Sequence, residues 1–62
     1  MCLSTVYKNE ISEAAVAMKN VMRIECTEDK VILTDLMDRT VELQGKLESA
    51  NLVDGFVIVK TN

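Results

Sequence analysis

The chain has 62 residues, 48% of them hydrophobic, and its ten Asp and Glu residues against seven Lys and Arg residues give a formal net charge of −3. This length allows one domain, residues 1–62, and the apolar content argues against disorder. An isoelectric point of about 4.7 disfavours nucleic-acid binding, and no apolar run approaches the ~20 residues of a membrane span. The chain opens without a basic-then-apolar secretion signal, so we expect a cytoplasmic protein that binds neither membranes nor nucleic acid.

The first half of the chain contains one ambiguous segment and one clear strand. Residues 12–19 combine helix-forming alanines with the even spacing of Val16 and Met18, which leaves helix or strand open and favours a strand ending near Asn20. Residues 21–27 alternate, with Met22, Ile24 and Cys26 on one face. This pattern predicts a half-buried strand in which Cys26 fills core space as a small hydrophobe.

The second half predicts short strands joined by tight turns. Residues 31–36 follow a polar turn at residues 28–30, which predicts a hairpin with the strand before it. A polar break at residues 37–39 precedes a short strand at 40–43, and Gly45 indicates a bulge or sharp bend. Asp54-Gly55 between apolar runs is a strong hairpin signal, with a last strand at 56–60. We therefore predict an all-β fold, a small SH3-like or Sm-like antiparallel barrel of about six short strands, because closure removes exposed strand edges.

The reactive side chains are few, and they argue against an enzyme. There is no histidine, and the two glycines stand ten residues apart, so neither a catalytic triad nor a phosphate-binding loop is present. The carboxylates at 28, 29, 35 and 38 fall in predicted turns, where they form turns and carry solvated charge. A disulfide between Cys2 and Cys26 is disfavoured in a reducing cytoplasm.

Cys2 is the residue that offers distinctive chemistry. The amine of Met1, the backbone amide of Cys2 and the Cys2 thiolate would form adjacent chelate rings; without Met1, the amine belongs to Cys2 itself. Planar nitrogen and sulfur donors favour Ni(II) or Cu(II), and reduction of Cu(II) by thiolate leaves Ni(II), or Cu(I) in another geometry. Two termini meeting across a two-fold axis would complete a four-coordinate site, and the homodimer would also stabilise so small a barrel.

The amino-terminal MCLSTVY resembles the Met-Cys opening of the CooT-like small nickel-binding proteins. The similarity continues through VMRIE, TDLMD and GKLESANLVDGFVIV, and it covers nearly the whole chain. The resemblance implies a small β-barrel homodimer that binds Ni(II) through Cys2. It also implies a role in nickel delivery to the nickel-iron-sulfur carbon monoxide dehydrogenase.

The sequence is therefore compatible with three functions. The first is a nickel-binding accessory protein, a metallochaperone or nickel store, with Cys2 and Met1 as metal ligands. The second is a small-barrel interaction module, such as an Sm-like RNA- or protein-binding domain, against which acidity and the presence of only two aromatic residues argue. The third is a redox module that uses Cys2 in an intermolecular disulfide.

Overall fold

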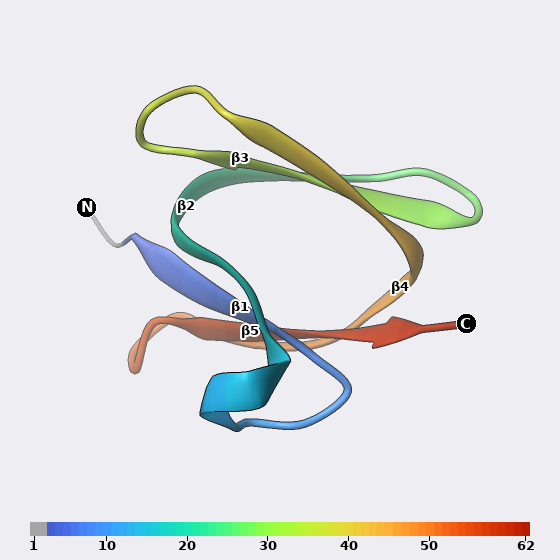
Figure 1. Ribbon diagram of the computed structural model, residues 1–62, viewed down its shortest axis with the longest axis horizontal. Coiled ribbons are helices and arrows are strands. Elements are labelled where there is room, and N and C mark those ends of the chain that lie inside the picture. Colours follow the sequence, from blue (N-terminus) through green and yellow to red (C-terminus); the bar gives the residue numbers. More distant parts are fainter. Residues whose placement is uncertain (1–2) are drawn as a thin grey trace.

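The computed structural model describes residues 3–62 as a closed barrel in which neighbouring strands follow chain order, β1-β2-β3-β4-β5 (Figure 1). All neighbouring pairs are antiparallel except β1 and β5, which are parallel and close the barrel. The elements are β1 (Ser4–Lys8), the 3-10 turn η1 (Glu13–Ala15), β2 (Val16–Cys26), β3 (Lys30–Asp35), β4 (Thr40–Asn51) and β5 (Phe56–Thr61). This confirms the predicted all-β small barrel.

The barrel interior is filled almost entirely by branched aliphatic side chains. The buried cluster consists of Val6, Val21, Val31, Leu33, Val57 and Val59. In β5 and in the first four residues of β3 these residues alternate with less buried neighbours, as expected for strands with one face inside the barrel, whereas Thr34 and Asp35 at the end of β3 are both buried. Tyr7 and Phe56, in the parallel pair, meet edge to face with ring centroids 6.5 Å apart. The period-two pattern thus identified the strands because valine and leucine point inward at every second position.

The ambiguous segment at residues 12–19 divides between two conformations. Residues 13–15 form η1, and β2 begins at Val16, so the strand prediction holds from that residue onward. β2 then continues without a break to Cys26, past the predicted strand end near Asn20. The left-handed φ of Asn20, +56°, bends the strand without ending it.

The prediction that Cys26 fills the core is wrong. A bulge between Val21 and Arg23 breaks the alternation, and Met22 is 47% exposed. Cys26 is also exposed, although it pairs with the buried Val31. The last β1–β2 pair is Ser4 with Val21, so within residues 3–62 this end of β2 has only β3 beside it. Side chains there have no second neighbouring strand to cover them.

β4 is one long strand that pairs with β3 along its first part and with β5 along its second. Residues 40–44 pair with β3, and from Gly45 onward the strand pairs with β5, so it wraps around one side of the molecule (Figure 1). A Cβ at Gly45 would collide with the Lys60 carbonyl oxygen. The predicted bend is therefore a close backbone approach at Gly45, and the register shift comes between Leu47 and Ser49.

The predicted hairpins are present at both expected positions. Thr27 N donates to Lys30 O at 2.9 Å between β2 and β3. The β4–β5 turn ends at Gly55, whose φ of +77° requires a residue without a Cβ penalty. Because β2 and β4 are each continuous, the sheet has five strands where about six short ones were expected. Among the described residues, no helix is long and apolar enough to cross a membrane.

Candidate metal centre at the amino-terminal end

The predicted metal ligands Met1 and Cys2 lie outside the described residues. The structure does describe the start of β1, the strand that follows them in the chain. Ser4, the first residue of β1, is buried and pairs with Val21 of β2. Thr5 N donates to Gly55 O at 2.9 Å on the other side. The start of β1 is therefore held between the bend of β2 and the β4–β5 turn.

Several segments at the same end of the barrel as the start of β1 carry exposed apolar side chains. Leu36 N donates to Asn20 O, which joins the β3–β4 loop to the bend of β2, and the β4–β5 turn contacts β1 directly. Figure 1 shows both connections at the same end of the barrel as the start of β1. The exposed apolar residues of these segments, here called the apolar rim, are Met22 (47%), Leu36 (57%), Met37 (72%), Leu52 (69%) and Val53 (95%). Large apolar side chains left exposed at one end of a small domain are candidates for an interaction surface.

The β3–β4 loop is held in shape by the carboxylate of Asp35, which is 3% exposed. Its Oδ1 accepts the backbone N–H groups of Met37 and Arg39 at 2.9 Å, and its Oδ2 accepts Arg39 Nε at 2.8 Å. The backbone hydrogen bond from Arg39 is the largest cause that lowers the pKa of Asp35, and the Arg39 guanidinium lowers it further. The loop that presents Leu36 and Met37 is thus anchored by hydrogen bonds and an ionic contact to a buried carboxylate.

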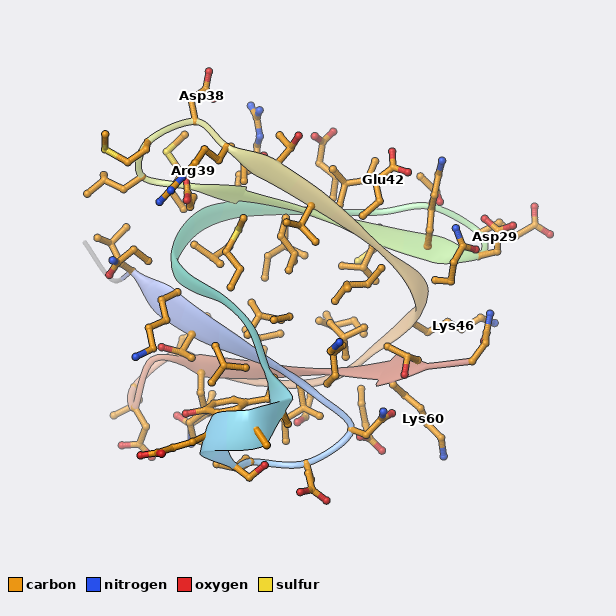
Figure 2. All side chains as sticks on the ribbon, in the orientation of Figure 1. Asp29, Asp38, Arg39, Glu42, Lys46 and Lys60 are labelled. Carbon is orange, nitrogen blue, oxygen red and sulfur yellow. The ribbon has the colours of Figure 1, made fainter. Side chains whose placement is uncertain are left out.

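A hollow of about 440 Å³ lies against this anchored loop and the bend of β2. Figure 2 shows the Arg39 side chain folded back beneath the loop, whereas Asp38 points away from it. The hollow is lined by Met18, Lys19, Asn20, Asp35, Arg39, Thr40 and Val41. It adjoins the Ser4–Val21 pair through Asn20 and is therefore close to the start of β1.

Within residues 3–62, no cluster of three or more Cys, Asp or Glu side chains could hold a metal ion. Cys26 lies five residues along β2 beyond Val21, roughly 16 Å from the strand position opposite Ser4. Cys26 therefore lies away from the start of β1, where the candidate metal centre is expected.

Sequence reasoning missed the apolar rim and the residues that line the hollow. Residues 37–39 were interpreted as a polar break, but Met37 is the most exposed residue of that loop among the large hydrophobics. The signal was available in Leu36-Met37 and Leu52-Val53, two apolar pairs at or beside turns, where polar residues are the norm. That both pairs face the same end depends on how β4 wraps, which the linear pattern does not reveal.

Comparison with known proteins gives a consistent result. The sequence profile of the family "CO dehydrogenase accessory protein CooT" matches residues 1–60. No curated protein matches the chain. Among solved structures, the crystal structure of a protein from Carboxydothermus hydrogenoformans assigned as a CooT has the same fold, with a TM-score of 0.83, 18% sequence identity and 98% of each chain covered. The chain therefore belongs to the CooT family, whose members are accessory proteins of CO dehydrogenase and not enzymes, as the sequence predicted.

Proposed function

We propose that this protein carries nickel for CO dehydrogenase and binds Ni(II) through Cys2. The thiolate of Cys2, its backbone nitrogen and the amine of Met1 supply a planar set of nitrogen and sulfur donors, which suits Ni(II). Family membership supports the client, because the family is defined by service to that enzyme. The ion is cargo, and an exchangeable shell near the chain terminus lets a client take it by ligand replacement.

The observation that carries this proposal is the position of the start of β1. Ser4 pairs with Val21 beside the bend of β2, and Thr5 N donates to Gly55 O of the β4–β5 turn, so β1 begins at a defined place on the barrel. The segments that carry the apolar rim lie at the same end of the barrel. We further propose that a second copy covers the rim, so that two Cys2 thiolates approach the two-fold axis and share one nickel ion. The dimer would also add apolar burial to a barrel of only 62 residues.

A nickel titration tests the site directly. The parent protein and the Cys2→Ser variant are titrated with Ni(II) while the thiolate-to-nickel charge-transfer absorption is recorded. Cys26→Ser is the matched control, since Cys26 is exposed and lies away from the start of β1. We expect saturation at about half an equivalent per chain for the parent and for Cys26→Ser. The Cys2→Ser variant should show no charge-transfer band.

Two outcomes would contradict the proposal. Equal nickel affinity in Cys2→Ser and parent would remove Cys2 from the site. Saturation at one equivalent per chain would show that each terminus holds its own ion, which would disprove the shared site.

A further inference from the structure

The hollow between the bend of β2 and the β3–β4 loop contains a pre-oriented arginine with an unused edge. Asp35 accepts Arg39 Nε at 2.8 Å and also the Arg39 backbone N–H at 2.9 Å. The Nε bond orients the guanidinium of this 74% exposed side chain and leaves its two terminal nitrogens without a partner within residues 3–62. A guanidinium edge of this kind matches a carboxylate in a bidentate geometry. Because the bond to Asp35 already orients the Arg39 side chain, a ligand would lose less side-chain entropy on binding it.

Three more donor groups line the same hollow. Lys19, Asn20 and Thr40, whose side chains carry an ammonium, an amide and a hydroxyl group, are among its lining residues. None of them makes a side-chain hydrogen bond or ion pair in the described part of the chain, where the ion pairs are Arg23–Glu25, Lys30–Glu42 and Arg39–Asp35. The backbone of Asn20 is held at φ +56° and its carbonyl accepts Leu36 N, so the donors stand on a fixed frame.

The charge and the lining indicate what would bind. The lining carries two positive charges, on Lys19 and Arg39, and one negative charge, on Asp35. Asp35 already accepts three hydrogen bonds, so it offers little to a cation. Asp38, the next carboxylate along the chain, points away (Figure 2). Met18 and Val41 add apolar surface, which suits a carbon skeleton better than a bare inorganic ion.

We propose that this hollow binds a small organic anion with two carboxylate groups. One carboxylate takes the free edge of the Arg39 guanidinium and the other takes the Lys19 ammonium, with Asn20 and Thr40 as neutral donors. The volume of about 440 Å³ is sufficient for such a molecule. This site is independent of nickel, because none of its groups belongs to the Cys2 donor set.

The test is a titration of the ¹⁵N-labelled, nickel-free protein with succinate, followed by amide chemical shifts. We expect saturating shifts centred on residues 19, 20, 39 and 40, with a dissociation constant on the order of 1 mM. Acetate and inorganic phosphate should bind more weakly, because one lacks the second carboxylate and the other lacks the carbon skeleton. Cys2→Ser should bind succinate like the parent, so failure of the nickel site leaves this result unchanged.

Two substitutions assign the residues. Arg39→Lys keeps the charge but loses the bidentate edge and should weaken succinate binding about tenfold, and Lys19→Gln should weaken it similarly. Arg23→Lys is the control, because Arg23 pairs with Glu25 on the exposed surface of β2. Shifts that do not saturate, or equal affinity in Arg39→Lys, Lys19→Gln and Arg23→Lys, would overturn the proposal. Phosphate binding tighter than succinate would overturn the ligand class.

Discussion

Arg39 reaches back four residues to the buried carboxylate of Asp35, with 2.8 Å between Nε and Oδ2, and this contact sets the shape of the β3–β4 loop. The Arg39 side chain is 74% exposed and the Asp35 side chain only 4%. The pair therefore joins a solvent-facing cation to a carboxylate that the barrel wall covers. The loop carries two residues of the apolar rim, so the contact connects the stability of the barrel with the presentation of its proposed interface.

The first prediction concerns the pH dependence of folding. The folded-state pKa of Asp35 lies below its ordinary value of 3.8, so the unfolded chain binds a proton more readily. The resulting stabilisation of the folded state is complete at pH values above the ordinary pKa and is lost as the pH falls through the lowered pKa. Asp35→Asn should lower the thermal unfolding midpoint at neutral pH and flatten its decline in acid, measured by circular dichroism between about pH 2 and pH 7. Asp38→Asn, whose side chain points into solvent, is the control. An unchanged acid profile in Asp35→Asn would contradict the role of this carboxylate.

The second prediction compares the two glycines. A Cβ at Gly45 would collide with the Lys60 carbonyl oxygen, whereas at Gly55 the nearest atom is Leu3 O at 3.6 Å and the cost is the φ of +77° alone. Gly55→Ala should lower the free energy of unfolding by about 1 kcal/mol. Gly45→Ala should lower it by about 3 kcal/mol or more, because β4 and β5 must separate. Urea unfolding measures the free energy of unfolding of both variants. Equal losses would show that β4 tolerates a side chain at Gly45, where it approaches β5 closely.

The third prediction tests the apolar rim as the dimer surface. Val53 is 95% exposed, so Val53→Ser should leave the free energy of unfolding of the monomer nearly unchanged. If the second copy buries Val53, the same change should weaken the dimer about tenfold, as measured by sedimentation equilibrium. Ile11→Ser is the matched control, because Ile11 is also an exposed apolar residue (56%) but follows the opposite end of β1. A dimer weakened as much by Ile11→Ser, or one unaffected by Val53→Ser, would place the interface elsewhere.

The fourth prediction follows from the corrected position of Cys26. In a Cys2→Ser background the remaining thiol should react with an aromatic disulfide reagent in the native state nearly as fast as in denaturant, because Cys26 is exposed. A buried thiol would react only through opening of the barrel and would be slowed by orders of magnitude. Strong native-state protection would therefore restore the core interpretation.

The sequence by itself determined the class of fold and most of its turns. Alternating valines and leucines in β3 and β5 specified strands with one inward face, and Asp54-Gly55 specified the last hairpin. These features depend on neighbours in the chain, so a linear pattern records them. The opening Met-Cys pair likewise carried the resemblance that the family match over residues 1–60 confirmed.

Tertiary structure alone decided which side chains are covered and which gather at one end. Cys26 follows the alternation of Ile24 but is exposed, because β1 begins opposite Val21 and leaves that end of β2 without a second neighbour in residues 3–62. The apolar rim forms because β4 changes partner at Gly45 and brings its two flanking turns to the same end of the barrel. The hollow beside Arg39 exists because the loop folds back onto the bend at Asn20. Each of these depends on contacts between segments distant in the chain, and local periodicity holds no information about them.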